Sequence, residues 1–250
     1  CDIHGTTVAG VVVARRNNAL GTVGVAPGCG LVSVKVTVST VPCDGSFAIQ
    51  PSWFVNALDW AQTSGARITN SSLGLNLPSS ALAQKFVDTR NAGMVHFGGA
   101  GNDGGANLSY PASLPAVNAV SAVDRGGLLA NFAGGCLNFA ASSTSGTGLA
   151  FCAPGEDVYT TDQSGVAGYV PLDYVCIDGT SYASPFAAGV GALVASVAPD
   201  LAAAEIETIL RQTALDLGAA GYDTMYGDGL PKARAAVLAA LAAQRRDIAV

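Results

Sequence analysis

The alternation of two kinds of segment is the feature that most constrains how this 250-residue chain can fold. Short β-branched or apolar runs, typical of buried strands, alternate with longer stretches that carry apolar residues at helical spacing. The predicted strands are residues 31–38, 66–73, 94–100 and 117–123, with 149–153 as a shorter candidate. The predicted helices are residues 4–14, 52–64, 80–92, 181–198, 202–214 and 231–244. This order predicts a three-layer α/β domain whose mostly parallel sheet is covered by helices on both faces.

Composition favours a single domain over residues 1–250 and narrows the classes of partner. Half of the residues (50%) are hydrophobic and 12% are charged, which suits a large core. Gly, Ser, Asp or Asn interrupts every apolar run before the roughly 20 residues that a membrane span needs. The formal charge is −6, and the basic residues cluster only as the pairs 15–16 and 245–246. Nucleic acid and anionic membrane are therefore not expected as partners.

The six cysteines and two histidines bear on metal binding, and the cysteines also bear on the cellular compartment. The cysteines show no CxxC spacing, so a zinc site is not expected. Their even number favours disulfides and an extracellular, secreted protein, although six small buried hydrophobic residues are the alternative. The first residues, CDIHG, lead directly into an apolar segment without a signal peptide. The N-terminus is therefore predicted to be incomplete.

The run GTSYASPFAAGVGAL, residues 179–193, offers a candidate nucleophile. It predicts a buried helix that opens with the hydroxyl of Ser181, on a Gly-Thr approach that lets a substrate come close. The backbone amides and the dipole of a helix N-terminus stabilise an oxyanion that forms beside them. The alternative is that Ser181 only caps a core helix.

A serine nucleophile needs a base and oxyanion donors. Of the two histidines, His96 lies in an apolar strand pattern and is predicted to be a core residue. His4 precedes Gly5 and Thr6 at the start of a predicted helix, and it is the better candidate base. Asn102, in the loop GGAGNDGG that follows a predicted strand, could supply a carboxamide donor, although such a run is also an ordinary turn.

Three motifs, taken in order, resemble the subtilisin-like serine proteases. They are HGTTVAG from His4, GGAGNDG around Asn102 and GTSYASP around Ser181. The intervening segments GVAPGCGLVSVKV, NSSLGL, YPASLPAVNAVSAVD, FCAPGEDVYTT and YGDGLPKARAAV are also similar to the family. The resemblance therefore extends over nearly the whole chain.

The resemblance implies a serine endopeptidase that acts on proteins or peptides through an acyl-enzyme on Ser181. His4 would be the general base and then the acid, and Asn102 the side-chain oxyanion donor. It also implies that the substrate backbone pairs as an added strand with one wall of the cleft and faces a second wall. The wall that pairs with the substrate is Ser72, Leu73 and Gly74, and Gly99, Ala100 and Gly101 lie along the opposite wall of the first specificity pocket. No organic cofactor is implied, and calcium, which commonly stabilises the family, has no carboxylate cluster here that identifies a site.

One departure from the family pattern concerns the triad aspartate. The family orders its triad Asp, His, Ser, whereas only three residues precede His4. Asp2 is too close to His4 to be that residue, and the resemblance places it beside the pocket for the second substrate residue before the cut. A basic substrate side chain is expected there. The aspartate strand is expected to be lost by truncation or processing, or to come from a separate N-terminal polypeptide. A non-catalytic peptide-binding or structural module, a pseudoprotease, is the alternative.

Overall fold

The computed structural model describes residues 3–41, 46–76, 78–137 and 140–247, with side chains up to residue 244. Four parallel strands form the central sheet in the order β3–β4–β5–β6, and two antiparallel pairs, β1–β2 and β7–β8, lie outside it. The elements in chain order are α1 (His4–Val13), β1 (Thr37–Ser39), β2 (Phe47–Ile49), α2 (Pro51–Thr63), β3 (Ile68–Ser71), α3 (Ser80–Asn91), β4 (Val95–Gly99), β5 (Val117–Val123), β6 (Leu149–Pro154), β7 (Val158–Thr161), the 3-10 turn η1 (Gly165–Ala167), β8 (Tyr174–Ile177), α4 (Thr180–Val197), α5 (Ala203–Thr213) and α6 (Ala233–Asp247).

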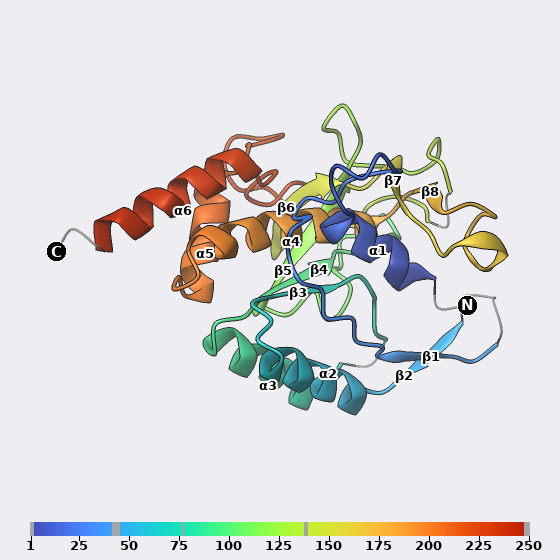
Figure 1. Ribbon diagram of the computed structural model, residues 1–250, viewed down its shortest axis with the longest axis horizontal. Coiled ribbons are helices and arrows are strands. Elements are labelled where there is room, and N and C mark those ends of the chain that lie inside the picture. The colour runs from blue at the N-terminus through green and yellow to red at the C-terminus, as the bar shows by residue number, and fades with distance from the viewer. Residues whose placement is uncertain (1–2, 42–45, 77, 138–139, 248–250) are drawn as a thin grey trace.

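Helices cover both faces of the parallel sheet (Figure 1). On one face, α2 and α3 bury Phe54, Leu58, Leu82 and Phe86 in a cluster that includes Val117 of β5. On the other face, a larger cluster joins side chains of β4, β5 and β6 to α4, α5 and α6, and α1 packs against α4. The predicted three-layer α/β architecture is therefore confirmed.

Helix α4 consists mainly of small and apolar residues, as expected of a helix that is packed on several sides. A Cβ added to Gly191 would lie 3.2 Å from the ring of Phe97 in β4, and one added to Gly189 would lie 2.7 Å from Val25. Neighbouring elements approach at these positions more closely than a larger residue allows. The predicted buried helix at residues 181–198 is confirmed, with a start one residue earlier.

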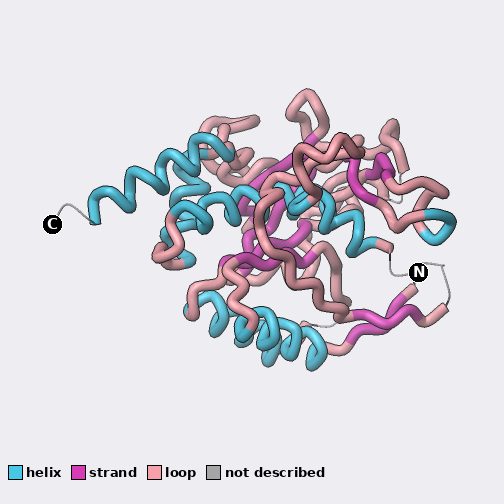
Figure 2. The backbone as a smooth tube through the Cα atoms, in the orientation of Figure 1, coloured by secondary structure: helices cyan, strands magenta, loops and turns pink. Residues whose placement is uncertain are grey.

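The prediction of a buried parallel strand at residues 31–38 is wrong. Only Thr37–Ser39 are paired, as β1, and their partner is the antiparallel strand β2. Residues 31–36 lie in the loop that joins α1 to β1 (Figure 2), and Leu31, Val32 and Val34 are 54%, 41% and 37% exposed. β-branched residues stabilise a strand only where a neighbouring strand supplies hydrogen bonds and packing. Among the described residues, the parallel sheet ends at β3 and does not extend to this segment.

The irregular stretch after Asp124 contains features that the sequence did not predict. The β7–β8 pair places Tyr159 against Tyr174, with the ring centroids 5.8 Å apart.

A disulfide joins Cys136 to Cys176, which confirms one oxidised pair, while Cys29 and Cys152 are free thiols. The remaining cysteines, Cys1 and Cys43, lie outside the described residues. No helix in the described part of the chain combines the length and the apolar character that a membrane crossing requires.

Candidate active site

Ser181 lies in the first turn of α4, at the end of the sheet where β3 and β4 finish. Its Oγ donates a 3.5 Å hydrogen bond to the carbonyl of Ser72, and Ser72 Oγ donates a 2.7 Å bond to the carbonyl of Ser181. Ser72 directly follows β3, so the end of that strand is tied to the start of the helix. Open α/β sheets bind ligands at this carboxyl edge.

The carboxamide of Asn102 is oriented by Thr180. Asn102 Oδ1 accepts 2.9 Å hydrogen bonds from both the backbone N–H and the hydroxyl of Thr180. A backbone N–H can only donate, so the oxygen must face Thr180 and Nδ2 must face the other way. The Thr180 hydroxyl in turn accepts from the backbone N–H of Gly101, which holds the loop after β4 in place.

Two N–H donors flank one point next to Gly179. This residue precedes α4 with φ +141°, in the region that favours glycine. A Cβ built on Gly179 would lie 3.4 Å from Asn102 Nδ2 and 3.7 Å from the backbone nitrogen of Ser181. The side-chain donor and the helix N-terminus therefore border the same small volume, and donors in such a position can stabilise a developing oxyanion.

His4 is the first residue of α1, which packs against α4. Its ring lies beside the residue that follows Ser181, since the ring centroids of His4 and Tyr182 are 6.0 Å apart. Burial lowers the pKa of the imidazole below its ordinary value. None of the residues that the structure describes forms a hydrogen bond with this imidazole. All three predicted catalytic residues thus lie beside the first turn of α4.

Both predicted substrate walls contact that turn, one through Ser72 and the other through Gly99. Leu73 is partly buried and packs against the α2–α3 cluster, whereas Gly74 is exposed. Gly74 also lines a cavity of about 450 Å³, together with Ser46, Phe47, Ala48, Ile49, Pro51, Leu75 and Asn76. On the other wall, Gly99 lies against Thr180, and Ala100 is fully buried. A Cβ on Gly101 would lie 2.6 Å from Ser109 Oγ. The predicted site residue Asp2 lies outside the described residues.

His96 is a core residue, as predicted, and lies away from the candidate site. It is fully buried in β4, where Nδ1 lies 2.7 Å from Thr69 Oγ1 and Nε2 lies 3.0 Å from Thr89 Oγ1. Its ring meets Phe86 edge-on, with centroids 5.0 Å apart. Burial lowers the pKa of His96 to about 4. The ring is therefore neutral at neutral pH and unavailable to substrate.

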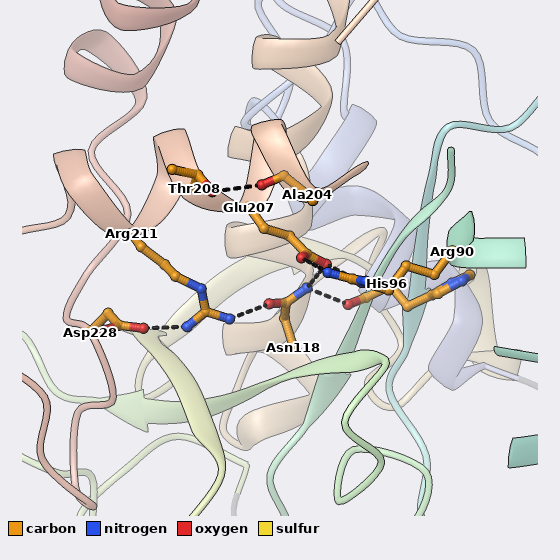
Figure 3. Close-up of polar contacts among 8 residues, drawn as sticks. All are labelled: Arg90, His96, Asn118, Ala204, Glu207, Thr208, Arg211 and Asp228. Atoms are coloured by element: carbon orange, nitrogen blue, oxygen red, sulfur yellow. Dashed lines mark hydrogen bonds and ion pairs between the residues drawn. The ribbon is translucent and has the colours of Figure 1, made fainter. Parts of the chain in front are cut away.

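Sequence reasoning missed a network of charged side chains behind His96 (Figure 3). Glu207 of α5 is paired with Arg90 of α3 and accepts a 3.1 Å bond from Asn118 Nδ2. Arg211 of α5 donates to Asn118 Oδ1 and is paired with Asp228. The sequence signal is limited to isolated charges, of which Arg90, Glu207 and Arg211 fall within predicted helices. The network joins helices on opposite faces of the sheet, near the start of β4 and β5.

One group of three potential metal-ligating side chains is present within the described ranges. Cys136, Asp157 and Cys176 place their ligand atoms within 4.8 Å of one another. The two sulfurs are joined as a disulfide, which removes the thiolates that a metal would require. The group therefore does not suit a metal ion, and it offers no calcium site.

Known proteins resemble this chain in sequence over most of its length. The sequence matches the Subtilase family over residues 1–229. It is 36% identical to subtilisin BL of Lederbergia lenta over 233 residues, 93% of this chain and 77% of that protein. It is also 36% identical to M-protease of Shouchella clausii (strain KSM-K16), with 93% of this chain aligned but only about half (54%) of the relative's length.

Solved structures agree with the sequence comparison. The psychrophilic subtilisin-like protease Apa1 of Pseudoalteromonas sp. AS-11 superposes with a TM-score of 0.80 and 20% identity, covering 94% of this chain and 83% of that one. A protease of Pseudoalteromonas arctica PAMC 21717 has a TM-score of 0.79 and 31% identity, with 95% of this chain and 70% of that one covered. Family match, relatives and fold coincide, and the chain belongs to the subtilase family.

Proposed function

We propose that this chain is the peptidase domain of a serine endopeptidase that forms an acyl-enzyme on Ser181. The observation that carries the proposal is the gathering of groups at the first turn of α4. The Ser181 hydroxyl and two neighbouring N–H donors belong to this turn or border it, and the His4 ring lies beside Tyr182 in the same turn, although these residues lie far apart in the sequence. Acyl transfer requires these three kinds of group around one carbonyl carbon.

The proposed reaction has two halves. His4 takes the proton of Ser181 as the Oγ attacks the carbonyl carbon of the scissile bond, and the carbonyl oxygen becomes an oxyanion. Asn102 Nδ2 and the Ser181 backbone N–H donate to that oxygen. His4 then protonates the departing amine and activates a water that hydrolyses the acyl-enzyme. Loss of an oxyanion donor raises the barrier by about 2.7 to 4 kcal/mol in a subtilisin, a value that belongs to a member of this same family and was not worked out from this structure.

The substrate is proposed to bind as an extended strand between residues 72–74 and 99–101. Exposure of Gly74 supports this, because a strand that pairs with the substrate needs accessible backbone groups. The adjoining cavity, with Phe47, Ile49 and Leu75 in its lining, suits an apolar substrate side chain. Recognition would then rest on the main chain first and on side-chain pockets second. The preference for a basic side chain beside Asp2 stays a prediction.

The carboxylate partner of His4 is proposed to come from a strand outside the described residues, on this or a separate N-terminal polypeptide. Two observations support the proposal. In the described part of the chain, β3 has a strand paired on one side only. The loop that joins α1 to β1 exposes Leu31, Val32 and Val34, whose composition is typical of a strand. A strand added beside β3 would cover apolar surface and complete the triad. The disulfide supports an extracellular location.

The pseudoprotease is the second candidate, because no described residue hydrogen-bonds the His4 imidazole. A peptidyl diphenyl phosphonate, which modifies activated serines, separates the two when it is applied to the purified native protein. Stoichiometric labelling that disappears in Ser181→Ala, and falls strongly in Asn102→Ala, supports the peptidase. A wild-type protein that takes up no label, yet binds a peptide in the cleft, supports the binding module and overturns the peptidase.

A further inference from the structure

We propose that Tyr182 is a positioning residue that holds the His4 helix against the Ser181 helix through a chain of hydroxyl groups. This inference rests on the proposed peptidase function and names a residue that sets the geometry of that site. Tyr182 follows the candidate nucleophile and is 2% exposed. Its hydroxyl lies 3.3 Å from Thr7 Oγ1 in α1, and its ring lies beside the His4 ring. Tyr182 belongs to α4, which carries Ser181, and these contacts link it to α1, which carries His4.

The direction of each hydrogen bond follows from counting protons. Thr7 Oγ1 must donate its only proton to the His4 carbonyl, 2.7 Å away, because a carbonyl can only accept. Tyr182 must then donate to Thr7. The result is a directed chain from Tyr182 through Thr7 to the backbone carbonyl of His4. Bonds in such a chain polarise and strengthen one another.

The first turn of α1 depends on contacts of this kind. Its N-cap residue, Ile3, provides no side-chain cap. Two carbonyls of the turn accept hydrogen bonds from hydroxyls of β7. Thr160 Oγ1 of β7 donates to the Thr7 carbonyl at 2.7 Å, and Thr161 Oγ1 donates to the Thr6 carbonyl at 2.9 Å. Both bonds tie α1 to β7. Within the described contacts, the Tyr182–Thr7 hydrogen bond is the one that ties this turn directly to α4.

Packing around Tyr182 fixes its ring in the position that the chain of hydroxyls requires. The ring lies in a buried cluster with Val11 of α1, Val158 of β7, and Val175 and Ile177 of β8. Burial also raises the pKa of the Tyr182 hydroxyl, which keeps it protonated and able to donate. The ring centroid distance of 6.0 Å to His4 is within aromatic contact range, so the ring also limits where the imidazole can move.

Kinetics of the native protein test the proposal on a peptide substrate. Tyr182→Phe keeps the ring and removes the donor, and we expect kcat to fall about 3-fold to 10-fold with KM nearly unchanged. Thr7→Val should do the same, Thr7→Ser should restore most of the rate, and the double variant should be no worse than the poorer single one. Tyr159→Phe makes the same chemical change on an exposed tyrosine of β7 and should leave kcat unchanged. Additive effects of Tyr182→Phe and Thr7→Val, or a kcat unchanged by Tyr182→Phe, would overturn the proposal.

Amide hydrogen exchange provides a readout that does not require turnover. Tyr182→Phe should lower the protection of the first turn of α1, while protection of the parallel sheet stays as in the wild type. Phosphonate labelling of the wild type separates a failure of the peptidase proposal from a failure of the positioning role of Tyr182. If Ser181 takes no label, the peptidase proposal fails whatever the variants do. If Ser181 is labelled but Tyr182→Phe changes neither kcat nor exchange in α1, the positioning role alone is refuted.

Discussion

Acidification should destabilise this protein through His96. The imidazole is fully buried between the hydroxyls of Thr69 and Thr89, and its pKa is about 4 in the folded chain against an ordinary 6.5. Below pH 6.5 the His96 imidazole is protonated in the unfolded chain but stays neutral in the folded chain. The free energy of unfolding therefore falls as the pH falls towards 4. The gap between the two pKa values corresponds to about 3 kcal/mol, at about 1.36 kcal/mol for each pKa unit. Above pH 6.5 the effect is absent.

Urea unfolding at pH 7, 6, 5 and 4 measures this contribution. His96→Gln is the comparison, because a carboxamide can hydrogen-bond in the same place and does not titrate. The variant is expected to be less stable at pH 7, since it loses the edge-on contact with Phe86. Between pH 7 and pH 4, however, the wild type should lose about 3 kcal/mol more than the variant does. If the two proteins lose equal free energy of unfolding between pH 7 and pH 4, the argument that the buried neutral imidazole causes the loss of stability in acid is refuted.

Three further predictions concern the cleft and the buried network. Gly179→Ala should lower kcat at least tenfold, because alanine is strained at φ +141° and its methyl would occupy the volume that the oxyanion donors border; wild-type kinetics of this variant would contradict the site geometry. Glu207→Gln should lower the free energy of unfolding by about 2 kcal/mol, since it breaks a largely buried ion pair. Asp88→Asn removes the charge of an exposed carboxylate and should lower the free energy of unfolding by less than about 0.5 kcal/mol. Equal effects of the two substitutions would refute a stabilising role of the buried Glu207–Arg90 ion pair. His4 should titrate below pH 6.5 by NMR in the chain alone, and a docked strand bearing aspartate, but not asparagine, should raise its pKa.

Much of the fold was readable from the sequence because its signals are local. The strand predicted at residues 117–123 is β5 with the same bounds, and the helix predicted at 52–64 is shifted by one residue. Their positions follow from hydrophobic spacing and chain direction alone. The strand predicted at residues 31–38 failed for the opposite reason. Its residues have strong strand propensity, but a strand also needs a paired neighbour, which propensity cannot supply.

The sequence by itself determined the alternation of strands and helices and the three motifs that contain His4, Asn102 and Ser181. Each depends on residue type and short-range spacing, which any stretch of chain expresses without its neighbours. Only the tertiary structure decided that Asn102 turns its NH2 group away from Thr180, that Tyr182 reaches Thr7, and that the His96 imidazole lies between the hydroxyls of Thr69 and Thr89. Those contacts join segments up to 175 residues apart. They exist because packed helices and strands bring distant side chains within hydrogen-bond reach, and no local pattern in the sequence records which groups will meet.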